Sequence, residues 1–170
     1  MKKIVIVTIS LFLILGGYII VDYLTYSPLK EQEFKNLFPN YDYSGKIKKS
    51  VDFVGLSLHG ELFDVFIYKL SKMDINNGYP SKNKWTNITT SEEFTISIWQ
   101  KNPIDSLTFA KCKDIFELGN QSNRVYASFI TELSNPANYY SYLYVNALEY
   151  YFFLYCPNKQ HLYYVRKRGW

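Results

Sequence analysis

An uncharged, mostly apolar run covers residues 4–21 and is preceded by Lys2 and Lys3. As a helix that rises about 1.5 Å per residue, this run would span about 27 Å, close to the roughly 30 Å hydrocarbon core of a bilayer. The apolar side chains of such a helix must be shielded from water, either by lipid or inside a protein core. We therefore predict a transmembrane helix, with residues 1–24 as a membrane anchor and residues 25–170 as a separate domain.

Two alternatives remain open for this run: a cleaved signal peptide and a buried helix of a soluble protein. Signal cleavage needs small residues at the cleavage site, and the tripeptides 14–16 and 15–17 both begin with a bulky residue. The tripeptide 25–27 has small outer residues but is followed by Pro28. A retained anchor is therefore the favoured interpretation.

The charges that flank the run indicate its orientation. Lys2 and Lys3 precede it, whereas Asp22 is the first charge after it, so the positive-inside bias places the start of the chain in the cytoplasm. The short Lys-Lys start and a composition rich in Asn, Lys, Ile and Tyr are typical of bacterial proteins. We expect a single-pass protein of the bacterial inner membrane whose domain faces the periplasm or the exterior.

The composition favours one packed domain that is rich in strands. The chain has 170 residues, of which 48% are hydrophobic and 19% aromatic, and a formal net charge of +4. The hydrophobic content excludes a disordered chain, and aromatic side chains suit a pleated, half-buried surface. Because the modest charge forms no extended basic stripe, we expect no nucleic-acid partner.

Strand-like and helix-like segments alternate along the predicted domain. Helices are predicted over residues 29–38 and 106–118, a surface loop over 71–93, and strands over 94–99 and 124–132, with a β-hairpin within 46–70 that turns at His59-Gly60; residues 139–146 fit a strand or a helix. The fold class that follows is α+β, with a mostly antiparallel sheet and one or two packed helices.

The end of the chain carries the clearest signal. Residues 148–156 and 161–168 form a predicted β-hairpin with a four-residue loop, which pairs Cys156 with His161. This register places Tyr151 opposite Arg166 and Glu149 opposite Arg168. Since successive side chains alternate between faces, one face is core and the other is aromatic with a cationic end.

We predict that this second face binds a partner, either another protein or an envelope component. Tyr and Arg are enriched in the residues that dominate protein interfaces. A helix or loop that covered the face would turn it into core instead, and the basic residues near the end of the chain, Lys159 and His161 among them, also fit a solvated strand edge. The predicted binding residues are Tyr151, Phe153, Tyr155, Tyr164, Arg166 and Arg168.

Cys112 and Cys156 are the two cysteines of the chain. Disulfides persist outside the cytoplasm, where we place this domain. Packing of the predicted helix 106–118 on the core face of the hairpin would bring the two residues together. We predict a disulfide between them, and two buried free thiols are an equally compatible alternative.

A weak catalytic signal centres on Ser57. The segment 55–60 resembles a nucleophile elbow, a turn that presents a serine between a strand and a helix, and Asp105 or Asp114 and then His161 follow in the order of α/β-hydrolases. The match is incomplete, because His59 stands where the motif requires glycine. A hairpin turn is the simpler interpretation of this segment.

Metal and cofactor sites have still less support. His59, Glu61 and Asp64 lie close in sequence, but zinc sites need three or four converging ligands and the chain has two histidines. We find no phosphate-binding glycine loop and no dinucleotide fingerprint. We expect no metal, no cofactor and no catalytic residue.

The sequence therefore predicts a membrane-anchored extracytoplasmic module that binds a partner without catalysis. Two alternatives from other classes remain open, a serine hydrolase centred on Ser57 and a structural subunit of an envelope assembly. A continuous helix over residues 4–38 would favour the structural subunit.

Overall fold

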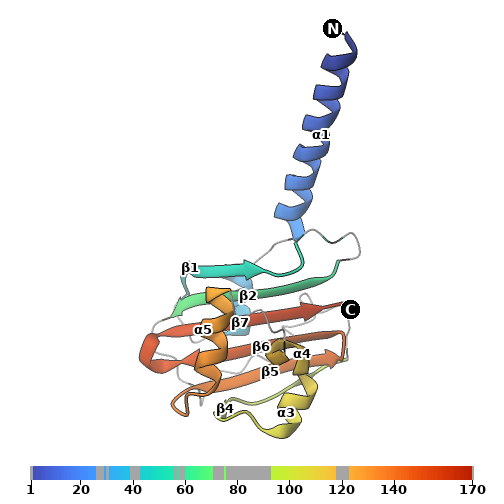
Figure 1. The fold of residues 1–170 in the computed structure, drawn as a ribbon. Coiled ribbons are helices and arrows are strands. Elements are labelled where there is room, and N and C mark those ends of the chain that lie inside the picture. The colour runs from blue at the N-terminus through green and yellow to red at the C-terminus, as the bar shows by residue number, and fades with distance from the viewer. Residues whose placement is uncertain are drawn as a thin grey trace.

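The computed structural model describes residues 2–25, 29, 31–38, 43–55, 57, 60–70, 75, 93–117 and 123–169. Figure 1 shows a single twisted sheet with helices on it and one long helix that extends away from it. The helices are α1 (Lys2–Thr25), α2 (Glu31–Leu37), α3 (Ser106–Lys111), α4 (Lys113–Glu117) and α5 (Arg124–Leu133), with a short 3₁₀ turn, η2 (Pro157–Lys159).

The seven-stranded sheet has the order β1-β2-β7-β6-β5-β3, with β4 also paired to β5, and every pair is antiparallel. The strands are β1 (Tyr43–Asp52), β2 (Leu62–Leu70), β3 (Thr95–Ile96), β4 (Gln100–Lys101), β5 (Tyr139–Asn146), β6 (Glu149–Cys156) and β7 (His161–Arg168). The predicted α+β class with a mostly antiparallel sheet is confirmed.

The C-terminal hairpin forms in the predicted register. Tyr151 pairs with Arg166, Glu149 with Arg168 and Cys156 with His161. The order of the sheet places β6 and β7 in its interior, and every residue of β6 is buried. An interior strand buries both faces when helices cover both faces of the sheet, so the alternation of β6 separates two cores rather than a core from a surface.

Helices cover both faces of the sheet. The helices α3, α4 and α5 lie on one face (Figure 1), where Ile115, Tyr126 and Phe129 pack on Phe152 and Tyr163. On the opposite face, α2 and the residues beside it pack on the aromatic side of the hairpin. The residues of this second core that come from α2 and its flanks are Leu29, Phe34, Leu37 and Phe38.

The predicted strand over residues 124–132 is wrong, because this segment is the helix α5. The Asn123 side chain accepts hydrogen bonds from the backbone amides of Val125 at 2.9 Å and Tyr126 at 3.3 Å, which caps the first turn. Val125, Phe129 and Glu132 are buried at helical spacing. The apolar residues of this segment fit both the two-residue period of a strand and the 3.6-residue period of a helix. Packing on the sheet favours the helix.

The other predicted elements are present with changed boundaries. The helix 106–118 divides at Cys112 into α3 and α4, and the helix 29–38 shortens to α2. The segment that fitted either a strand or a helix is β5, and only short strands, β3 and β4, form near 94–101. Most of the predicted loop over 71–93, and the predicted turn residue His59, lie outside the described residues.

The predicted N-terminal helix is present as α1, which has 24 residues. Leu29 is not helical and α2 begins at Glu31, so residues 4–38 do not form the continuous helix that would favour a structural subunit. Across the described ranges, we find no helix that combines the length and the apolarity needed to cross a membrane.

Candidate functional site

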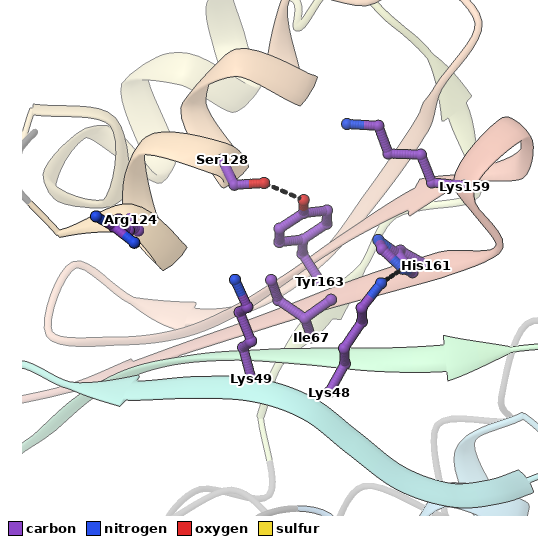
Figure 2. A pocket seen from close by; sticks show the side chains of 8 residues that line it. All are labelled: Lys48, Lys49, Ile67, Arg124, Ser128, Lys159, His161 and Tyr163. Atoms are coloured by element: carbon purple, nitrogen blue, oxygen red, sulfur yellow. Dashed lines mark hydrogen bonds between the residues drawn. The ribbon is translucent and has the colours of Figure 1, made fainter.

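A basic cleft lies between the edge strand β1 and helix α5, and encloses a cavity of about 110 Å³. Figure 2 shows its side chains coming from β1 and β2 below, from α5 above and from the hairpin beside them. The lining residues are Lys48, Lys49, Ile67, Arg124, Ser128, Lys159, His161 and Tyr163.

A β-bulge explains why two adjacent lysines reach the same cleft. In a regular strand, neighbouring side chains point to opposite faces. The pairing of β1 with β2 shifts between Ile47 and Lys49, so Lys48 and Lys49 together oppose Ile67. A bulge of this kind re-aims side chains at a sheet edge, and here both lysines line the cavity.

The opposite wall is one face of α5. Arg124 and Ser128 are four residues apart and therefore lie one above the other along the helix. Buried Tyr126 and Phe129 hold the helix on the sheet, and the Tyr126 hydroxyl donates to the Ile115 carbonyl at 2.8 Å. The packed face of α5 thus fixes the direction in which Arg124 and Ser128 point.

A pair of hydroxyls links the α5 wall of the cleft to β7. Ser128 Oγ and Tyr163 Oη lie 2.7 Å apart, and one donates to the other. Burial raises the pKa of Tyr163, so the phenol stays protonated at neutral pH. Their mutual bond uses one of two hydroxyl protons and leaves the other available to a ligand.

The cleft has an excess of positive charge. Lys48, Lys49 and Arg124 are exposed, and no carboxylate in the described part of the chain forms an ion pair with any of them. Lys159 differs, because its ammonium pairs with the buried Glu132. Like charges held together without counter-charges repel, so the cleft favours an anion.

His161 connects this cluster to β7. The Lys48 ammonium donates to His161 Nε2 at 3.2 Å, which requires the imidazole to be neutral (Figure 2). Burial and the nearby ammonium groups of Lys48 and Lys159 hold the pKa of His161 below its usual range. At neutral pH, His161 therefore adds a polar group to the cleft but no charge.

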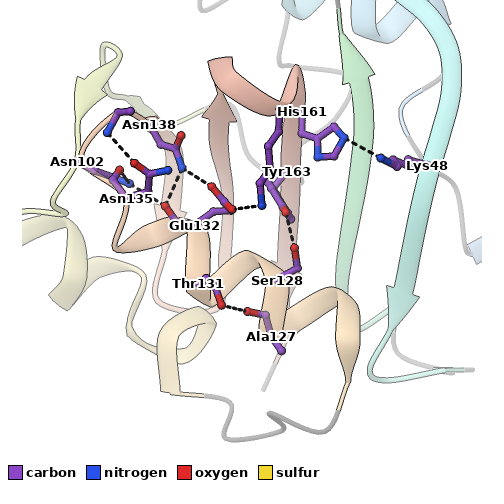
Figure 3. Close-up of polar contacts among 12 residues, drawn as sticks. Lys48, Asn102, Ala127, Ser128, Thr131, Glu132, Asn135, Asn138, His161 and Tyr163 are labelled. Atoms are coloured by element: carbon purple, nitrogen blue, oxygen red, sulfur yellow. Dashed lines mark hydrogen bonds and ion pairs between the residues drawn. The ribbon is translucent and has the colours of Figure 1, made fainter.

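Glu132 anchors the other end of α5 (Figure 3). Its carboxylate accepts from Asn138 Nδ2 at 2.9 Å and from Lys159, and its backbone carbonyl accepts from Asn102 Nδ2 at 3.2 Å. Burial disfavours ionisation of Glu132, but the bonds from Lys159 and Asn138 outweigh it and lower the pKa. This network ties α5 to the hairpin loop and so supports the cleft.

The predicted aromatic binding face is not a surface. Tyr151, Phe153, Tyr155 and Tyr164 are at most 2% exposed, and the ring centroids of Phe38 and Phe153 lie 5.4 Å apart. The prediction of an exposed face is wrong because α2 and its flanks cover this side of the sheet.

The two predicted arginines are tied down within the domain. Arg166 is buried and pairs with Asp64, and Arg168 is half-buried and donates from Nε to the Gly60 carbonyl at 3.0 Å. Their guanidinium groups therefore hold the domain together rather than form the cationic end of an adhesive face.

The structure brings the two cysteines into one core cluster but does not join them. Cys112 and Cys156 are free thiols, and both are fully buried. Burial raises the pKa of Cys112 to about 12 and also raises that of Cys156. The predicted disulfide is absent, and the alternative of two buried thiols describes the structure.

Among the described residues, the partner of the Ser57 hydroxyl is an acid and not a histidine. Its hydroxyl donates to Glu61 Oε2 at 3.2 Å and accepts from the Glu61 amide at 3.0 Å. It lies in the connection between two antiparallel strands, where Gly55 and Gly60 adopt positive φ, and not between a strand and a helix. The hairpin interpretation is confirmed.

The acids and the histidine proposed as partners of Ser57 have other roles. Asp105 caps α3, Asp114 pairs with Lys167 and His161 contacts Lys48. Of the residues considered for a metal, Asp64 pairs with Arg166 and His59 lies outside the described residues. In the described ranges, no three His, Cys, Asp or Glu residues form a cluster that could hold a metal.

Sequence reasoning missed the cleft, although it singled out the basic character of Lys159 and His161. Two adjacent lysines, Lys48 and Lys49, are visible in the sequence as a local positive charge. The bulge that points both side chains to one face is not visible there. Comparison of the chain with protein-family models, curated proteins and solved structures found no match.

Proposed function

We propose that this chain is a membrane-anchored extracytoplasmic module that binds an anionic ligand or partner in the basic cleft, without catalysis. Residues 4–21 would lie in the bacterial inner membrane, and residues 25–170 would face the periplasm or the exterior. The observation that carries the binding role is that Lys48, Lys49 and Arg124 line one cavity and that none of them forms an ion pair with a carboxylate among the described residues.

The membrane location is supported by the sequence of α1 and by its surroundings. Residues 4–21 carry no charge, and apolar side chains on all sides of this helix are exposed to solvent. A helix that is apolar all round is typical of a buried or lipid-facing position. Apolar area left in water costs about 25 cal/mol per Å², so this helix requires a cover, and lipid supplies one. The exposed apolar residues include Val5, Ile6, Ile9, Phe12, Leu13, Ile14, Ile19 and Ile20.

Binding is preferred to catalysis because the reactive groups of the cleft are not joined. The Ser128 hydroxyl bonds to Tyr163, whereas the His161 imidazole bonds to Lys48. A nucleophile needs a base within hydrogen-bonding reach, and the described residues of the cleft offer no such pair. An anion, in contrast, finds cations on two walls and a hydroxyl pair that links α5 to β7. An acidic envelope component or an acidic segment of another protein would both present such a group.

The binding role can be tested by calorimetric titration of the full chain, in neutral detergent at low salt, with sodium sulfate. The variant Lys49→Gln with Arg124→Gln is expected to lose sulfate binding, because it removes a cation from each wall. Lys101→Gln removes one exposed charge at the far edge of the sheet and is expected to bind as the unmodified chain does. Equal binding by all three proteins, or binding by none, would disprove the proposed site.

The membrane location has its own test. The full chain is expected to stay with membranes after alkaline carbonate extraction, and a chain that lacks residues 4–21 is expected to be released. Release of the full chain into the soluble fraction would contradict the anchor and leave the result for the cleft unaffected.

A further inference from the structure

The donors of the cleft are arranged in three dimensions rather than in one plane. Lys48 and Lys49 come from β1 and Arg124 from α5, and the bonded hydroxyls of Ser128 and Tyr163 lie between α5 and the sheet (Figure 2). A carboxylate presents two oxygens in one plane, whereas a phosphate or sulfate group presents oxygens in several directions. Arg and Lys are the usual partners of such oxyanions.

The charge of the cleft also matches a doubly charged group. Lys48, Lys49 and Arg124 supply the positive charges that lack an ion-pair partner within the described residues, whereas Lys159 is paired with Glu132. A doubly charged oxyanion would balance more of this positive charge than a singly charged group would.

His161 lies among charged groups that come from several elements. Lys48 on β1 contacts its Nε2, and Lys69 on β2 is its partner in the strand register. Lys159 on η2 and Glu132 on α5 are the other charged groups near it in the described part of the chain, and Cys156 on β6 and Tyr163 on β7 are titratable neighbours. The lysines favour the neutral imidazole, and Glu132 favours the protonated one.

Resting on the proposed function, we propose that the bound group is a doubly charged tetrahedral oxyanion, a phosphate or sulfate group, and that its binding is coupled to the uptake of one proton by His161. The anion offsets the ammonium groups that keep His161 neutral, and solvent supplies the proton. Protonated His161 no longer accepts a hydrogen bond from Lys48. The Lys48 ammonium then turns from the imidazole to the anion, and His161 becomes a further cation of the cleft.

The test is a sulfate titration of the full chain in neutral detergent at about pH 5.5 and about pH 8, on either side of the ordinary histidine range. Sulfate keeps both charges at these pH values, so a change in affinity reports on the protein. We expect tighter binding at the lower pH, by up to about tenfold, the limit for a shift of about one unit in the pKa of a single group. Titration in two buffers of different ionisation enthalpy should show proton uptake.

The matched variant is His161→Gln, whose side-chain oxygen still accepts from Lys48 but takes up no proton. It is expected to bind sulfate equally at both pH values and to release or take up no proton. A melting temperature close to that of the unmodified chain shows that the variant is folded. If the pH dependence survives in this variant, or is absent from the unmodified chain, the coupling to His161 is wrong while the proposed binding function stands. Loss of sulfate binding at both pH values would instead disprove the proposed function.

Two further arms test the shape and the source of the group. Malonate at about pH 8 carries the same charge as sulfate on two planar carboxylates, and equal affinity for both would overturn the tetrahedral preference. Phosphatidic acid in the micelle and soluble glycerol phosphate carry the same phosphate monoester. Competition with sulfate by the lipid indicates a headgroup, and competition by the soluble ester indicates a free ligand. Failure of both to compete would overturn the assignment.

Discussion

Arg166 and Asp64 form a buried ion pair between two neighbouring strands of the sheet. The two residues are partners in the register of β2 and β7, and the guanidinium Nε donates to the Asp64 carboxylate. The side chains are 10% and 2% exposed, and the guanidinium carbon lies 5.1 Å from the centre of the Phe66 ring. Removal of either charge would leave the other buried without a partner, so the two residues stabilise the fold only as a pair.

Replacement of Asp64 by Asn should therefore be strongly destabilising. The variant leaves the Arg166 charge in the core without its carboxylate, and we expect a loss of about 3 to 5 kcal/mol in the free energy of unfolding. Urea denaturation measures this loss. The double variant Asp64→Leu with Arg166→Met removes both charges and should lose less. Asn at position 64 with unchanged stability would contradict the buried pair.

Tyr151 should behave as a core residue and not as a surface residue. Tyr151→Ala removes a ring that is 2% exposed, and we expect a loss of about 3 to 5 kcal/mol in the free energy of unfolding. Tyr151→Phe keeps the ring and removes the hydroxyl with its 2.8 Å bond to Glu149, so a loss of about 1 kcal/mol is expected. Thermal denaturation compares the two variants. If the Ala variant is as stable as the Phe variant, the Tyr151 ring is not part of the core.

Asp105 should make the stability of the domain sensitive to acid. Its carboxylate accepts from the Thr108 hydroxyl and from Tyr140 and caps α3, and these bonds lower its pKa from 3.8 to about 2. Because the folded pKa is the lower one, this stabilisation is present above pH 3.8 and is lost as the pH falls towards 2.

The variant Asp105→Ala tests this acid sensitivity. It should lose about 1 kcal/mol at neutral pH, as expected for a lost helix cap, and the difference from the unmodified chain should shrink as the pH falls below 3.8. Denaturant titrations at a series of pH values measure both effects. A difference that stays constant down to pH 2 would mean that the Asp105 carboxylate does not respond to its folded contacts.

Cys112 and Cys156 should resist thiol reagents in the native protein. Both are fully buried, and burial raises the pKa of Cys112 to about 12, so the reactive thiolate is scarce. Under native conditions we expect no labelling by a thiol-reactive dye, and in denaturant we expect both residues to label. If the two cysteines do not react with the dye even in denaturant, they are joined by a disulfide.

Local patterns predicted the parts of the fold whose partners are close in sequence. The hairpin of β6 and β7 has the predicted register, because a four-residue loop and strict alternation leave few other ways to pair Cys156 with His161. The Asn123 cap is also a local signal, and it identifies the start of α5, where residue preferences alone favoured a strand. Cap signals thus carry information that apolar periodicity over a short segment lacks.

By itself, the sequence determined the α+β class, the antiparallel hairpin and the uncharged apolar run of α1. Only the tertiary structure decided that α2 covers Tyr151 and Phe153, that Cys112 and Cys156 stay apart as thiols, and that Lys48, Lys49 and Arg124 meet in one cleft. The reason is physical. Alternation within a strand tells which side chains share a face, but burial of that face depends on segments that are distant in the chain and that pack only when the whole domain folds.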